Sequence, residues 1–141
     1  MNTYTGGYTM DQEMKNKLIS EARDARHFAR VPTSGFHVGA AILTKEGEII
    51  TGCNVECKTV LSSICAERTA MVKAVSMGYT EFEAIAVVSD AEKAVSPCSF
   101  CRQYLLDFNP KMLVIMSNAD QSDVVEMTVE ELVPFAFTGT E

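Results

Sequence analysis

The residues with the clearest potential for chemistry are a Cys-Ala-Glu stretch and a Cys-x-x-Cys stretch further along the chain. Cys65 precedes Glu67 by two positions, and Cys98 and Cys101 stand three positions apart in PCSFC. At the first turn of a helix this spacing brings two sulfurs to one side, and Cys65 stands at the predicted start of another helix. Three thiolates bind zinc at about 2.3 Å and leave the fourth tetrahedral position open for water, as in catalytic zinc sites.

Other interpretations of these cysteines stay open on spacing alone. Cys53, Cys57, His27 or His37 could supply a fourth ligand and turn the site into a closed, structural one. The Cys-x-x-Cys pair could instead be a redox couple. The cysteines could also be small buried apolar residues.

Glu67 favours the open site, because a water activated by zinc needs a proton acceptor close by. The alternative for Glu67 is favourable placement of a negative charge at a helix N-terminus. The two stretches together are a more specific indication of a zinc site than either stretch alone. They match the zinc-deaminase pattern, in which His or Cys, one residue and Glu are followed later by Pro-Cys-x-x-Cys.

Composition limits the classes of protein to which the chain can belong. It has 141 residues, 47% of them hydrophobic, and a net charge of −7, which fits one globular domain over 1–141 and not a disordered chain. The acidic balance argues against general nucleic-acid binding. No apolar run is long enough to span a membrane, and the polar N-terminus is not a secretory signal. We therefore expect a cytoplasmic protein, and in that compartment five cysteines point to metal or redox chemistry.

The pattern of apolar residues predicts alternating helices and strands after an opening hairpin. Residues 1–10 are expected to form a flexible tail. Helices are predicted over 11–30, 65–78 and 97–108, with a short capped turn from 128. Strands are predicted over 36–44, 49–55, 82–89, 112–117 and, more weakly, 124–129. This order implies an α/β fold in which a mixed sheet has helices on its faces.

Several separated motifs, in order, resemble the cytidine deaminase family in its small homotetrameric branch. They are FHVGAAILT, GCNVE, ICAERTA, AIAVVSD, SPCSFCRQ and ELVPFAF, and the resemblance covers roughly residues 11 to 137. The chain is also similar to the blasticidin S deaminases, which share the zinc motifs. The resemblance implies a three-layer α/β/α fold with a central sheet of about five strands.

The resemblance implies one zinc ion per chain, bound by Cys65, Cys98 and Cys101. It gives Glu67 the role of moving protons during catalysis. It places the guanidinium of Arg68 beside the ligand sulfurs, where a cation withdraws charge from the thiolates. The alternative for this arginine is a surface ion pair with an acid such as Glu83.

The resemblance also implies five contacts with the substrate within one chain. Asn54 and Glu56 would hydrogen-bond the ribose, and Phe36 would line the pocket. The backbone N–H of Ala66 would meet the base carbonyl, and the backbone carbonyl of Ser96 would meet the amino group. Without the family pattern, the asparagine fits the turn at a strand end, and the phenylalanine fits the core.

The C-terminal stretch ELVPFAF and a short loop bear on assembly and on substrate choice. Phe137 would close the site of a neighbouring chain, which makes the expected assembly a homotetramer with shared sites. The loop 57–61 departs from the family, because Val60 and Leu61 stand where tyrosine and glycine are usual. Thr33 likewise replaces a usual tyrosine. These departures affect the expected substrate more than the expected reaction.

The function predicted is zinc-dependent hydrolysis of a free pyrimidine nucleoside, cytidine or deoxycytidine, to uridine or deoxyuridine and ammonia. One alternative is deamination of blasticidin S or of a modified cytidine. Another is a non-catalytic, zinc-stabilised nucleoside-binding protein, which would have no need of Glu67. Editing of RNA or DNA is disfavoured by the acidic charge and small size.

Overall fold

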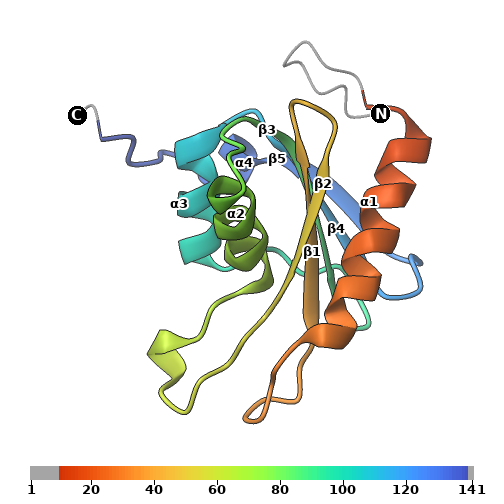
Figure 1. The fold of residues 1–141 in the computed structure, drawn as a ribbon. Helices are drawn as coiled ribbons and strands as arrows, with labels where there is room; N and C mark the ends of the chain where they lie inside the picture. Colours follow the sequence, from red (N-terminus) through yellow and green to blue (C-terminus); the bar gives the residue numbers. More distant parts are fainter. Residues whose placement is uncertain (1–9, 140–141) are drawn as a thin grey trace.

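The computed structural model describes residues 10–139, which form a single five-stranded sheet covered by helices (Figure 1). The strands are β1 (Val38–Thr44), β2 (Ile49–Cys53), β3 (Phe82–Ser89), β4 (Leu113–Asn118) and β5 (Val124–Thr128). The helices are α1 (Gln12–Ala25), α2 (Ala66–Ser76), α3 (Ser99–Phe108) and α4 (Val129–Leu132). Short 3₁₀ turns follow α1 at Arg26–Phe28 (η1) and precede α2 at Val60–Ser62 (η2). Within the described range, no helix combines the length and apolar character that a membrane span requires.

The sheet is mixed, as the order of elements predicts. Its strand order is β2-β1-β3-β4-β5. The pair β3–β4 is parallel and is connected through α3, whereas the other three neighbouring pairs are antiparallel. A parallel pair requires such a crossover, and the helix supplies it.

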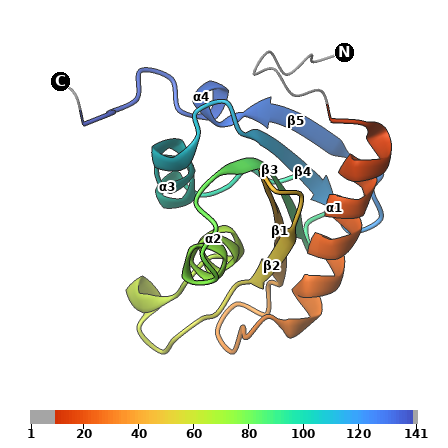
Figure 2. The ribbon, with the colours of Figure 1, turned by 45° about the horizontal axis from the view of Figure 1, so that its top comes forward.

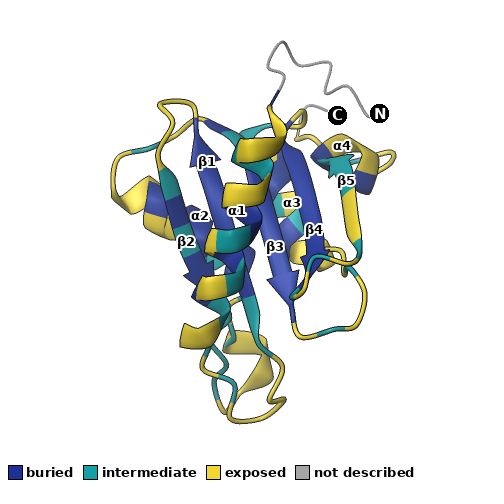
Figure 3. Ribbon diagram, turned by 90° about the vertical axis from the view of Figure 1, so that its right-hand side faces the viewer, coloured by how far each residue is buried: buried dark blue, intermediate teal, exposed yellow. Residues whose placement is uncertain are grey.

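The helices divide between the two faces of the sheet, which confirms the three-layer arrangement. Figures 1 and 2 show α1 alone on one face and α2 with α3 on the other. Alternate residues of β1 serve the two layers: Ala40 and Ile42 join the core under α2 and α3, and Ala41 and Leu43 join the core under α1. Figure 3 shows β1, β3 and β4 buried along their length, while the outer side of α1 is exposed.

The predicted elements are all present, and the main differences lie at their ends. The hairpin strands are shorter than predicted, because β1 begins at Val38 and β2 ends at Cys53. The side chain of Asn54 explains this: it accepts from the N–H of Val38 at 2.9 Å and donates to the carbonyl of Phe36 at 2.8 Å. A side-chain amide thus takes the place of further ladder bonds.

Two further segments differ from the pattern or fall partly outside the structure. The loop before α2 contains the 3₁₀ turn η2, which the sequence pattern did not predict. The expected tail lies outside the described residues except for Met10, which is buried against α1 and the sheet.

Candidate metal centre and pocket

Two cysteines stand at the starts of the two helices that cover the same face of the sheet. Cys65 is the N-cap residue of α2, and Cys98 is the N-cap residue of α3. Both have extended backbone angles, which are usual for an N-cap, but neither side chain accepts a capping hydrogen bond from a backbone N–H of its helix. Both sulfurs are therefore available as ligands. Cys101 lies one turn into α3 and is fully buried.

The three sulfurs meet in a cluster of the size that a tetrahedral metal requires. Sγ of Cys98 lies 3.6 Å from Sγ of Cys65 and 3.5 Å from Sγ of Cys101, and all three lie within 4.8 Å of one another. Thiolates bound to zinc at about 2.3 Å in a tetrahedron are about 3.8 Å apart. The donor set and its spacing therefore fit one zinc ion per chain with an open fourth position.

The alternative fourth ligands stay outside this cluster. In the described part of the chain, the residues grouped closely enough to hold a metal are Cys65, Cys98 and Cys101 alone. His37 instead bonds Asp90 through Nδ1 at 2.8 Å. The closed, structural site considered for this sequence therefore lacks its fourth ligand.

The charge on the sulfurs is balanced by an arginine on the first turn of α2. NH2 of Arg68 donates to Sγ of Cys65 at 3.6 Å, and its guanidinium lies 5.7 Å from the ring centre of Phe100. The hydrogen bond from the Cys101 thiol, opposed by burial and assisted by Arg68, lowers the pKa of Cys65 to about 5. Within the described chain this arginine makes no ion pair with an acid, so its contact is with sulfur and not with Glu83. Its Nε is buried without an acceptor there.

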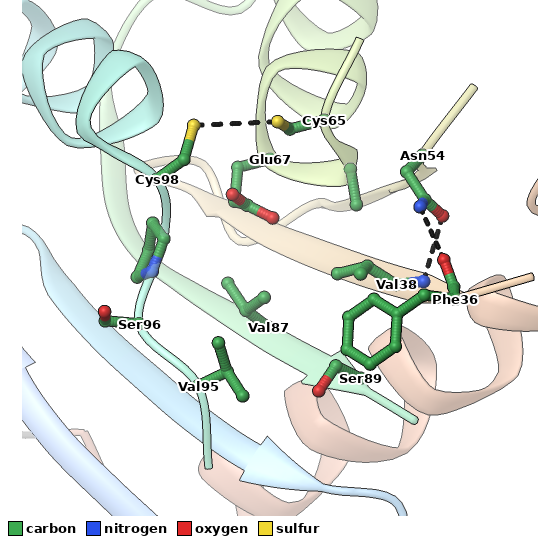
Figure 4. A pocket seen from close by; sticks show the side chains of 12 residues that line it. Phe36, Val38, Asn54, Cys65, Glu67, Val87, Ser89, Val95, Ser96 and Cys98 are labelled. Carbon is green, nitrogen blue, oxygen red and sulfur yellow. Dashed lines mark hydrogen bonds between the residues drawn. The ribbon is translucent and has the colours of Figure 1, made fainter. Parts of the chain in front are cut away.

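Glu67 is a buried carboxyl beside the sulfur cluster. Its side chain is 3% exposed, yet it lines the pocket. Figure 4 shows the carboxyl next to the pair Cys65–Cys98 and opening toward the hollow. Burial raises the pKa of Glu67 to about 7, against a hydrogen bond with Cys101 that lowers it. A carboxyl that titrates near neutrality can both accept and deliver a proton.

The pocket that opens beside this carboxyl is small and mostly apolar. Its volume is about 180 Å³, below the range of about 300–1,000 Å³ that is usual for pockets holding drug-sized ligands. Its lining residues are Phe36, Val38, Asn54, Cys65, Ala66, Glu67, Val87, Ser89, Val95, Ser96, Pro97 and Cys98. The space in a single chain therefore suits a flat ring better than a whole nucleoside.

Most of the predicted substrate residues meet in this pocket. Phe36, Asn54, Ala66 and Ser96 line it together with the metal centre. The amide of Asn54 already bonds the backbone on both sides of His37, so its first effect is to shape the wall that Phe36 forms. One N–H and one lone pair of that amide remain for a ligand.

Two predicted substrate residues lie elsewhere. Glu56 does not line the pocket, and its carboxylate accepts hydrogen bonds from the backbone N–H of Ser34 at 3.2 Å and from the hydroxyl of Ser34. Phe137 is 69% exposed and lines a separate hollow with α3 and the C-terminal segment. In a single chain, neither residue reaches the metal centre.

β3 and the loop after it contribute four lining residues that were not predicted, a third of the wall. Val87 and Ser89 face the pocket from the carboxyl end of β3, and Val95 and Pro97 face it from the loop that leads to Cys98. The alternation of β3 carries the signal for Val87 and Ser89, because both lie on the same face of that strand. The loop carries no comparable periodicity.

The residues that depart from the expected loop motif are remote from the pocket lining. Val60 and Leu61 lie in η2 and are 70% and 96% exposed. Thr33 is also exposed and is not part of the lining. Any effect of these departures on substrate choice must act at the rim or through another chain.

Comparisons with known proteins agree with the geometry. A family model described as the cytidine and deoxycytidylate deaminase zinc-binding region matches residues 12–117. A cytidine deaminase of Sporosarcina psychrophila is 49% identical over 86% of this chain and 90% of its own length. A blasticidin-S deaminase of Bacillus cereus is 38% identical over 72% of this chain and 77% of its own length.

A solved structure extends the likeness to the whole fold. The cytidine deaminase of Burkholderia pseudomallei matches 91% of this chain and 100% of its own chain, with 39% identity and a TM-score of 0.84. The family model covers most of the chain, including Cys65, Glu67, Cys98 and Cys101. The protein therefore belongs to the cytidine and deoxycytidylate deaminase family.

Proposed function

We propose that the protein is a zinc-dependent hydrolase that deaminates free cytidine or deoxycytidine to uridine or deoxyuridine and ammonia. One observation carries the proposal: a buried carboxyl with a pKa near 7 lies beside three converging sulfurs at the inner end of a pocket that fits a pyrimidine ring. A zinc-binding scaffold without activity has no use for a buried carboxyl at that point. The similarity to proteins named cytidine deaminase supports the same reaction.

Cys65, Cys98 and Cys101 would hold the zinc ion. Bound zinc lowers the pKa of the attacking water, so that the water becomes a nucleophile near neutral pH. Glu67 accepts one proton of that water and delivers it to N3 of the base as the water oxygen bonds to C4. It then takes the second proton from the new hydroxyl on C4 and passes it to the amino nitrogen, which leaves as ammonia when its bond to C4 breaks. Its burial supports both roles, because the pKa of about 7 lets the carboxyl change protonation state at little cost.

The walls of the pocket orient the base. The N–H of Ala66 belongs to the first turn of α2 and has no partner within the helix, so it is free to meet the base carbonyl. The carbonyl of Ser96 accepts from the amino group, and Phe36 covers one side of the ring. Asn54 bonds a sugar hydroxyl with its remaining polar capacity, and Glu56 binds another hydroxyl at the rim.

We infer that the active unit is a homotetramer with shared sites, working in cytoplasmic pyrimidine salvage. The pocket of one chain suits a flat ring better than a whole nucleoside, and several large apolar side chains are exposed elsewhere on the surface. Phe135 and Phe137 in the C-terminal segment and Leu61 in η2 are among the most exposed. A neighbouring chain would cover these side chains and complete the pocket.

A mixing experiment tests the shared site. Chains with Glu67→Gln lack the proton carrier, and chains with Phe137→Ala lack the closing ring. After subunit exchange, a site built from Glu67 of one chain and Phe137 of the other is intact, so the mixture should recover activity that neither variant has. A monomeric, fully active wild type in light scattering would contradict the assembly.

The reaction itself is tested by ammonia release from a panel of compounds, with zinc content measured on the same sample. The panel comprises cytidine, deoxycytidine, 5-methylcytidine, cytosine and blasticidin S. We expect cytidine and deoxycytidine to be the best substrates. The similarity to the Bacillus cereus enzyme makes blasticidin S the second candidate. A protein with one zinc per chain that turns over no member of the panel would refute the proposal.

A further inference from the structure

Arg102 follows the buried ligand Cys101 and joins three separate parts of the chain. Its Nε donates to the carbonyl of Pro97 at 2.7 Å, and its NH2 donates to Oγ of Ser96. Its NH1 donates to the carbonyl of Leu132, the last residue of α4, at 3.1 Å. Figure 2 shows α3 and α4 side by side, which explains how one guanidinium reaches both segments.

These bonds leave one acceptor of the pocket segment unpaired. The hydroxyl of Ser96 and the carbonyl of Pro97 are both occupied by Arg102. No hydrogen bond to the backbone carbonyl of Ser96 is present among residues 10–139. Ala94, two positions before Ser96, is fixed as well, because its backbone N–H donates to the carboxylate of Asp123 at 2.9 Å. The segment is thus held at both ends, and the carbonyl of Ser96 remains for a ligand.

A guanidinium suits this position for a physical reason. Its donors lie in one rigid plane, so fixing one bond largely fixes the others, whereas a lysine ammonium has no such fork. The neighbouring Gln103 makes a parallel link, since its Nε2 donates to the carbonyl of Phe137 at 2.9 Å. The start of α3 therefore connects the pocket wall to the C-terminal segment.

We propose that Arg102 is a positioning residue, which aims the carbonyl of Ser96 at the exocyclic amino group of the substrate and ties that aim to the position of α4. The inference rests on the proposed function, because it takes the amino group of cytidine as the donor that this carbonyl recognises. Arg102 itself touches neither substrate nor metal.

The test compares a ligand that has the amino group with one that lacks it. In Arg102→Lys, kcat/KM for cytidine should fall about threefold to tenfold, which corresponds to the loss of one hydrogen bond. The inhibition constant of uridine should stay within about twofold, because uridine has an oxygen at that position and no N–H to donate. Zinc content and melting temperature are measured in parallel. Arg23→Lys, on α1 at the opposite face of the sheet, is the matched control and should change neither constant.

Ser96→Ala keeps the test valid if the lysine variant loses zinc. This variant removes one acceptor of Arg102 but leaves the carbonyl of Ser96. It should lower kcat/KM for cytidine by less than Arg102→Lys does, and the inhibition constant of uridine should again stay within about twofold. With a wild type that turns over cytidine, two results would overturn the inference. One is an equal loss in kcat/KM for cytidine and in the affinity for uridine, and the other is no change of either constant in either variant. A wild type that does not turn over cytidine would overturn the proposed function and this inference with it.

Discussion

Replacing Gly52 by alanine should damage catalysis by displacing α2, the helix whose start carries Cys65 and Glu67. Gly52 lies in β2 directly beneath α2. An added Cβ would lie 2.4 Å from the backbone nitrogen of Ala70 and 2.7 Å from the carbonyl oxygen of Ala66. Cβ contacts stay above 3.0 Å, so the helix or the strand must move by about 0.6 Å. Both contacts are with backbone, so no side chain can turn aside to relieve them.

The size of this movement sets the expected effect. Overpacking of this kind costs about 1–3 kcal/mol of unfolding free energy. Glu67 and the ligand Cys65 stand at the start of the displaced helix. A misplacement of about 1 Å in an active site costs about 10²-fold in rate, so a movement near 0.6 Å should lower kcat/KM for cytidine by about tenfold or more.

The assay combines urea unfolding with kcat/KM, at equal zinc occupancy. Gly39→Ala is the matched control, because its Cβ would lie 1.9 Å from the carbonyl oxygen of Ala22 in α1, on the opposite face of the sheet. It should lose at least as much stability and, in the folded fraction, less activity. Wild-type stability and activity in Gly52→Ala would refute the steric reasoning. An equal loss of activity in both variants would refute the link between α2 and catalysis.

Three further outcomes follow from the site. Glu67→Gln should keep one zinc per chain and lose about 10²–10⁴-fold in kcat, as zinc analysis with turnover would reveal; near-normal turnover would rule out its role. Cys98→Ala should release zinc and lower the melting temperature, and a full complement of zinc would remove Cys98 from the ligands. Burial raises the pKa of Asp90, but hydrogen bonds from His37 and then the charge of Arg26 outweigh it and leave that pKa lowered. A lowered pKa stabilises the fold above the unfolded-state value of about 3.9 and less as pH falls through the folded value. The stability gap between wild type and Asp90→Asn in urea should therefore shrink from pH 7 to about pH 3; a constant gap would show that the carboxylate charge is not involved.

The metal centre could be predicted because its geometry is mostly local. Cys98 and Cys101 share a helix turn, and Cys65 stands at the start of a helix that Gly78 ends, so both elements follow from residues close in sequence. Helices on one face of a sheet then bring the two starts together. Glu67 stood out for the same reason, since a carboxyl on the apolar side of a helix needs an explanation.

The parts that escaped prediction depend on contacts distant in sequence. Arg102 acquires its role from Leu132, thirty positions away, and no local pattern announces such a bond. The end of β2 depends on whether the backbone N–H of Val38 bonds the side-chain amide of Asn54 or a further backbone carbonyl of the sheet. Glu56 bonds Ser34 in this chain, twenty-two positions before it. The proposed place of Phe137 at a neighbouring chain's site would depend on a second chain, on which one sequence is silent.

The two cysteines at the helix starts also have a consequence for how the protein acquires its metal. An N-cap side chain that bonds its own helix typically contributes about 0.5–2 kcal/mol, and both α2 and α3 forgo that contribution at Cys65 and Cys98. Zinc bound by the two sulfurs would offset this loss and join the two helix starts to each other. Metal loading and ordering of the inner end of the pocket are therefore one thermodynamic event. Without the metal, we expect the chain to fray first at the starts of α2 and α3 beside the pocket, while the sheet stays formed.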